Sequence, residues 1–181
     1  MEKPTLAPHA YYGRIDGTLV LRLSGPIRFI TCQALRGFVD SLRGGDDEDV
    51  LIDLRDVQTI DSTGMGLLAR IGRSSLESRG RRAAIACPGN DIATTLRSAA
   101  FDTLFVMLDT YPFDEHDATF AEMPLGGGEP GTGSDAQISL GRVILDAHRD
   151  LASMSEHNVE VYRDVIAALE TELRTTRGSP S

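Results

Sequence analysis

The chain has no tryptophan, only two cysteines among its 181 residues, and no long uninterrupted apolar run. Two cysteines do not make a disulfide framework, and such a chain is typical of a reducing compartment. No apolar segment reaches the length of roughly 18 residues that a transmembrane helix needs, and the N-terminal stretch is not apolar enough for a signal peptide. We therefore expect a cytoplasmic protein with no segment inserted in a membrane.

Positive charge is also scarce. The 18 lysines and arginines are outnumbered by 27 acidic residues, which gives a formal net charge of −9. A nucleic-acid-binding protein needs a basic face, and the sequence offers only the short run "RGRR" at 79–82. The chain is long enough for one ordinary domain and an extension, and nucleic acid is not an expected partner.

Motifs that would indicate an enzyme or a metalloprotein are missing. The four histidines lack the spacing of a zinc site, so we expect them to be solvent-exposed side chains and not metal ligands. The glycine-rich stretch 126–133 follows no predicted strand and lacks the Lys-Ser/Thr ending of a phosphate-binding loop, which makes a tether the better interpretation. No serine lies in a Gly-x-Ser-x-Gly motif, and no histidine partner for Ser62 is evident. We expect a protein without catalytic residues, metal or cofactor.

Apolar strands and amphipathic helices alternate along the first two thirds of the chain. Asp16 and Gly17 indicate a tight turn between two strands, and Pro26 is expected to stop the second of them. The nearly continuous apolar run "VLIDL" at 50–54 is typical of a strand covered on both faces. Further strands are predicted at 81–87 and 103–109, and helices at 31–45, 65–80 and 91–101. This alternation predicts a mixed α/β fold with a central four- to five-stranded sheet and crossover helices.

The chain changes character after residue 120. Residues 111–137 carry six acidic side chains and no basic one, and 121–137 is predicted to be a flexible, acidic, glycine-rich linker. A helical extension is predicted over 138–175, either as one long helix or as a hairpin that bends at 153–158. Its apolar stripe is larger than soluble monomers usually expose to water, so we expect it to pack against its own domain, a second copy in a homodimer, or another partner. The stripe consists of Leu151, Met154, Tyr162, Val165 and Leu169.

The segment "TIDSTGMG" at 59–66 places an acid, two hydroxyls and two glycines directly after the predicted buried strand. Asp61, Ser62 and Thr63 are residue types that cap the free N–H groups at the start of a helix, and the glycines let the chain turn without a Cβ penalty. Capping alone explains the segment. A serine held at the positive end of a helix is also a good phosphoryl acceptor, because a phosphate would add about −1.5 to −2 charges there.

The same segment carries a family resemblance. The stretch "VLIDLRDVQTIDSTGMGLLARIG", preceded by "LVLRLSGPI" and followed by "AAIACPGNDIATTLRSAAFDTLF", resembles the STAS domain of anti-sigma factor antagonists over about residues 10–120. The resemblance implies a binding protein and not an enzyme. Its unphosphorylated form would capture an anti-sigma factor that is also a serine kinase, phosphorylation of Ser62 would end the capture, and a serine phosphatase would restore it. The partner-binding residues implied are Asp61, Ser62, Thr63, Gly64 and Met65.

Arg28 departs from the family pattern, which has an acid near the serine after the second strand. We include Arg28 among the partner-binding residues because a guanidinium pairs readily with a phosphate. The resemblance leaves a second function open, namely a STAS subunit of a lipid or anion transporter complex whose serine is never phosphorylated. An Asp-Ser pair also marks carrier proteins that hold phosphopantetheine, but these are all-helical, and the predicted strand before Asp61 argues against that class.

Overall fold

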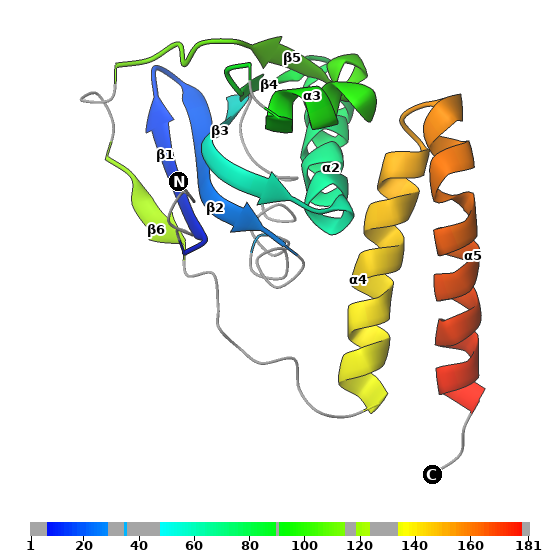
Figure 1. Ribbon diagram of the computed structural model, residues 1–181. Coiled ribbons are helices and arrows are strands. Elements are labelled where there is room, and N and C mark those ends of the chain that lie inside the picture. The colour runs from blue at the N-terminus through cyan, green and yellow to red at the C-terminus, as the bar shows by residue number, and fades with distance from the viewer. Residues whose placement is uncertain are drawn as a thin grey trace, which may run out of the picture.

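The computed structural model describes residues 7–28, 35, 48–89, 91–114, 119–123 and 134–178. Its strands form one six-stranded sheet of order β5-β4-β3-β2-β1-β6 (Figure 1). Strands β2 to β5 run parallel to one another, whereas β1 is antiparallel to both β2 and β6. The strands are β1 (His9–Ile15), β2 (Thr18–Ile27), β3 (Asp49–Ile60), β4 (Ala83–Ala86), β5 (Phe105–Leu108) and β6 (Ala121–Met123). The predicted α/β fold is confirmed, with one strand more than the sequence indicated.

The extra strand is β6, and it corrects the predicted start of the linker. Its three residues are too few to show the two-residue alternation that predicts a strand, and they lie within the range 121–137 that we expected to be a linker. Met123 is buried opposite Ala10 of β1. The far end of that range already belongs to a helix, which begins at Ser134, and 124–133 lies outside the described residues.

The first two strands follow the prediction except at Pro26. Asp16 and Gly17 both have positive φ, 48° and 75°, which is the backbone of a tight turn between antiparallel strands. Strand β2 does not stop at Pro26 but continues to Ile27. Strand β1 pairs with β2 only as far as Ser24. Beyond that point β2 has a paired neighbour only on its β3 side, so the missing N–H of the proline is tolerated.

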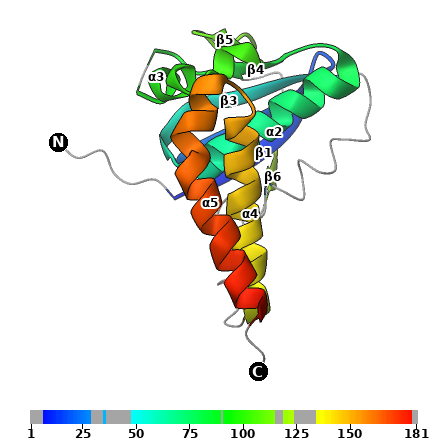
Figure 2. The ribbon, with the colours of Figure 1, turned by 90° about the vertical axis from the view of Figure 1, so that its right-hand side faces the viewer.

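The described helices form two layers on one side of the sheet (Figures 1 and 2). The inner layer contains α2 (Ser62–Arg79) and α3 (Asp91–Ser98), followed by the short 3-10 turn η2 (Phe101–Thr103). The outer layer is formed by α4 (Ser134–Ala152) and α5 (Glu156–Gly178), which lie side by side. The helix predicted over 31–45 lies outside the described residues except for Leu35, which is helical and buried. None of the described helices is both long and apolar enough to span a membrane.

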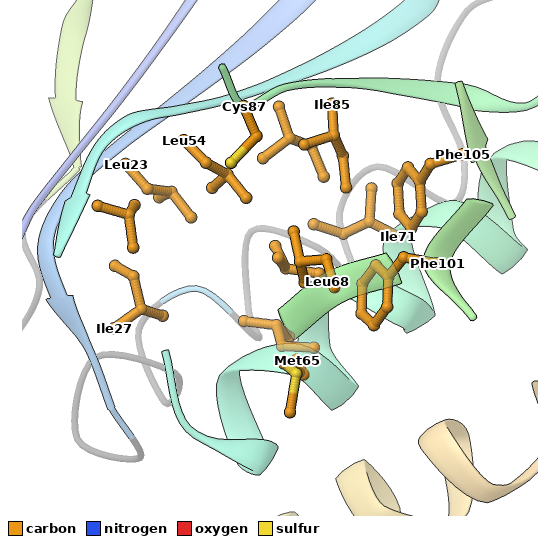
Figure 3. Close-up of a cluster of buried hydrophobic side chains, with 14 of the residues drawn as sticks. Leu23, Ile27, Leu54, Met65, Leu68, Ile71, Ile85, Cys87, Phe101 and Phe105 are labelled. Atoms are coloured by element: carbon orange, nitrogen blue, oxygen red, sulfur yellow. The ribbon is translucent and has the colours of Figure 1, made fainter. Parts of the chain in front are cut away.

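The main core lies between the sheet and α2 (Figure 3). Leu54 and Ile85 project from β3 and β4 toward Leu68 and Ile71 of α2, and all four side chains are buried. Cys87 is buried in the same cluster, as a small apolar side chain would be. Burial also raises the pKa of its thiol, so this cysteine stays protonated near neutral pH.

The opposite face of the sheet is covered by residues between β5 and β6, within the described ranges 109–114 and 119–120. Aromatic side chains of this segment pack on strand residues in a second, smaller cluster. The Arg22 guanidinium lies 4.6 Å from the centre of the Phe120 ring, and that of Arg55 lies 4.0 Å from the centre of the Tyr111 ring. Cation–π contacts of this kind hold the segment against the sheet. The cluster contains Ile15, Val20, Leu51 and Ala86, with Tyr111, Phe113 and Phe120 packed on it.

Helices α4 and α5, joined by residues 153–155, form what we call the C-terminal hairpin. The chain reverses within the predicted bend region, and buried Asn158 holds the reversal because its amide nitrogen donates to the carbonyls of Leu151 and Ala99, 3.0 Å from each. Leu151 is fully buried in the main core, and Met154 and Tyr162 pack against that core. Much of the predicted apolar stripe is therefore covered by the chain's own domain.

Candidate functional site

The candidate site lies where β3 ends and α2 begins. Asp61 has an extended backbone (φ −91°, ψ 173°), and its Oδ1 accepts a hydrogen bond of 2.8 Å from the N–H of Gly64. The backbone N–H of Asp61 donates to the carbonyl of Ile27 at the end of β2, at 3.1 Å. Asp61 is therefore the N-cap of α2, and the turn is held both by the helix and by the neighbouring strand.

The residues after Ser62 are packed into the protein. Thr63 and Met65 are buried, and a Cβ on Gly64 would lie 3.0 Å from side-chain carbons of both Ile27 and Ile60. A glycine lets α2 start close to the two strand ends without pressing on these side chains. Of the predicted partner-binding residues in this segment, Asp61 and Ser62 are the partly exposed ones, and Thr63, Gly64 and Met65 support them from below.

Replacing Asp61 with alanine is expected to lower the free energy of unfolding by about 1 kcal/mol, within a range of about 0.5–2, because the cap to Gly64 N–H is lost. Urea unfolding followed by circular dichroism measures this change. Asp56→Ala is the matched control, since Asp56 is an exposed aspartate of β3 and its loss should change stability by less than about 0.5 kcal/mol. Equal stability of Asp61→Ala and the control would contradict the capping role.

Ser62 is hydrogen-bonded to a residue that sequence reasoning missed. Its Oγ lies 3.0 Å from Nε2 of His148, which projects from α4. Nδ1 of the same ring lies 2.8 Å from the carbonyl oxygen of Ile144. A carbonyl only accepts, so Nδ1 carries the ring proton of the neutral imidazole, and Nε2 accepts from the serine hydroxyl.

The prediction that the histidines are solvent-exposed is wrong for His148. Its exposed fraction is 6%, and the ring of Tyr162 from α5 contacts it edge-on, with 5.6 Å between ring centres. Burial also raises the pKa of the Tyr162 phenol. The serine and the histidine are 86 positions apart, so no local spacing could indicate the pair. The one signal was that His148 lies beside Ala147 and near Leu151 on the apolar side of a predicted amphipathic helix.

Arg28 lies at the same end of the strands as Asp61. Ile27 of β2 pairs with Ile60 of β3, so the residues that follow each strand, Arg28 and Asp61, leave the sheet next to each other. Arg28 is exposed. The register thus brings the unusual arginine and the acid of the predicted site to one place.

Helix α4 packs directly on the N-terminal half of α2. A Cβ on Gly66 would lie 2.4 Å from the carbonyl oxygen of Ala147 and 2.6 Å from its Cα, so the two helix backbones are in contact. Beside this contact lies a cavity of about 20 Å³ bordered by Thr63 and Val143, which has room for a water molecule. Further along the same two helices, a polar groove of about 330 Å³ is bordered by Arg73 and Asp150. Among the described residues, no group of three or more His, Cys, Asp and Glu side chains is arranged to hold a metal ion.

This arrangement can accommodate a negatively charged group attached to the Ser62 hydroxyl. Ser62 is the first residue of an 18-residue helix. The free N–H groups and the dipole at a helix N-terminus stabilise negative charge there, typically by about 0.3–1 kcal/mol. A phosphoryl group on Ser62 would therefore be tolerated by the folded domain.

The first two thirds of the chain are similar to known proteins. The family model described as the STAS domain matches residues 12–117, which is more than half of the chain. A solved structure of an anti-sigma factor antagonist from Mycobacterium paratuberculosis is similar at 22% sequence identity, with 61% of this chain and 92% of that chain covered and a TM-score of 0.49. No curated protein matches the chain significantly. The matched range contains Ser62 and ends before α4, so the C-terminal hairpin lies outside it.

Proposed function

The chain belongs to the STAS domain family, and we propose that it is a protein-binding module of the anti-sigma factor antagonist type, switched by phosphorylation of Ser62. One observation carries the proposal. Ser62 is a partly exposed serine at the N-terminus of α2, directly after the Asp61 cap, within the range that the family model matches. A rigidly held hydroxyl at the positive end of a helix suits phosphoryl transfer from a kinase.

In the proposed cycle the chain binds and does not catalyse. Its unphosphorylated form captures an anti-sigma factor with serine-kinase activity, and a sigma factor is released to direct bacterial transcription. The kinase then phosphorylates Ser62 and dissociates, and a serine phosphatase returns the chain to its binding form. The surface of this chain that contacts the partner consists of Asp61 and Ser62, with Arg28 at the same end of the strands. It is supported by Thr63, Gly64 and Met65.

Electrostatics explain why phosphorylation would end the binding. A phosphate adds about −1.5 to −2 charges beside the carboxylate of Asp61, at a surface that loses water when a partner docks. Arg28 opposes this effect, since a guanidinium at the same edge attracts the phosphate. The net penalty is therefore expected in partner binding and not in the stability of the fold.

Intact-mass measurement tests the proposal. We expect the wild-type chain, incubated with ATP and the serine kinases encoded in the same genome, to gain the mass of one phosphoryl group with at least one of them. Ser62→Ala should gain none, because it lacks the acceptor oxygen. Ser78→Ala is the matched control, since Ser78 is an exposed serine of the same helix, and it should be modified like the wild type. A Ser62→Ala chain that gains the same mass would contradict the proposal, and so would the absence of any gain in every chain tested, whichever kinase is used.

A further inference from the structure

The C-terminal hairpin occupies the α2 surface that carries Ser62. Nε2 of His148 accepts a hydrogen bond from the Ser62 hydroxyl, and the backbone at Ala147 lies against Gly66 one turn further along α2. Thr63, between these two contacts, is only 6% exposed. The part of α2 that begins at the candidate phosphorylation site is therefore already an interface, and its occupant is α4 of the same chain.

Additional contacts hold the hairpin in this position. Arg73 of α2 donates to a carboxylate oxygen of Asp150 at 2.6 Å and to its backbone carbonyl at 3.0 Å, and it also bonds the hydroxyl of Ser153. Asn158 of α5 donates to Ala99, which follows α3. The docking is thus specified at three places along the domain, at the start of α2, near its middle and at the end of α3.

We propose that the C-terminal hairpin is an internal competitor for the α2 surface. When docked, it withholds the Ser62 hydroxyl from a kinase and the N-terminal half of α2 from a protein partner, so binding at this surface requires the hairpin to leave α2. The identity of the partner rests on the proposed function. That the hairpin covers the α2 surface rests on the contacts of α4 alone.

The contacts between α4 and α2 are of a kind that water or another protein can replace. The close approach of Gly66 and Ala147 involves two small residues, and the Ser62–His148 and Arg73–Asp150 pairs are polar groups that water or a partner can satisfy after separation. A site available in only a fraction of the molecules binds with an affinity reduced by that fraction. Releasing the hairpin should therefore increase both access to the surface and apparent affinity for the partner.

A substitution on the hairpin separates its effect from that of the binding surface. Ala147→Glu puts a charged side chain against the backbone of Gly66 and leaves every residue of α2 unchanged. The matched control is Ala168→Glu, the same change at an exposed position of α5. Gly66→Ala is the second opening variant. Its added Cβ cannot fit against Ala147, and alanine is a better helix former than glycine, so α2 itself is not weakened.

The accessibility of position 63 is the first readout. In a Thr63→Cys chain, N-ethylmaleimide labels the new thiol at a rate read by peptide mass spectrometry, which distinguishes it from the two native cysteines. We expect labelling at least about tenfold faster when Ala147→Glu or Gly66→Ala is added, and an unchanged rate with Ala168→Glu. Circular dichroism identifies any variant that has unfolded, and the other opening variant then decides. Labelling that is equally fast with and without the opening substitutions would overturn the proposal.

Phosphorylation is the second readout, and it distinguishes the two proposals. With a kinase that modifies the wild type, Ala147→Glu should be phosphorylated on Ser62 faster, and Ala168→Glu at the wild-type rate. Equal rates in all three chains would overturn the competitor role and leave the proposed function standing. If no chain is phosphorylated, the proposed function fails, and the labelling rates alone decide whether the hairpin covers the surface.

Discussion

Leu151→Ala is expected to lower the free energy of unfolding by about 2–5 kcal/mol, which is the usual cost of truncating a fully buried leucine. Leu151 belongs to the C-terminal hairpin, outside the range of the family match, yet its side chain has no exposed surface and belongs to the main core cluster. Removing most of it leaves a cavity between the hairpin and the domain, in addition to the lost burial of apolar surface.

Urea unfolding followed by circular dichroism measures this effect. Val161→Ala is the control, because Val161 lies on α5 with 54% of its surface exposed and its truncation should cost less than about 0.5 kcal/mol. The wild type should unfold in a single transition, since hairpin and domain share one core. A Leu151→Ala chain as stable as the control would mean that the hairpin is not docked in solution.

Ser62→Asp is expected to bind the partner kinase at least about tenfold more weakly than the wild type, which corresponds to about 1.4 kcal/mol. The introduced carboxylate lies beside Asp61, and two like charges must lose water together when a partner covers them. The substitution carries one charge where a phosphate carries about −1.5 to −2, so the effect of true phosphorylation should be larger.

Two control variants separate charge from the loss of the hydroxyl. Ser62→Ala removes the acceptor oxygen and the hydrogen bond to His148 without adding charge, so it should bind no more weakly than the wild type. Ser78→Asp adds the same charge at the exposed end of α2, away from the candidate surface, and should bind like the wild type. Ser62→Asp that binds as tightly as both controls would contradict the electrostatic switch.

The parts of this structure that depend on local pattern could be predicted from the sequence. The apolar run before Asp61 specifies a strand, and the capping residues that begin with Asp61 specify the start of a helix. Both elements are observed. The Asp16-Gly17 turn is equally local. Such features are predictable because hydrophobic periodicity and capping chemistry act over a few residues.

The parts that depend on distant contacts could not be predicted. Strand β6 has three residues and exists because β1 offers an unpaired edge. Pro26 stays in β2 because β1 ends before reaching it. His148 is buried because the hairpin packs on α2, and an apolar stripe indicates that a helix will be covered without indicating by which surface. The candidate site was therefore recognised at Ser62, and its covering helix was not.

The central claim is that one phosphate on Ser62 switches protein binding. The most direct test measures the dissociation constant of the partner kinase for the unmodified chain and for the same chain carrying a phosphate only on Ser62, with ADP present so that no further transfer occurs. The account predicts that the phosphorylated chain binds at least about tenfold more weakly. Equal dissociation constants for the two forms would contradict it.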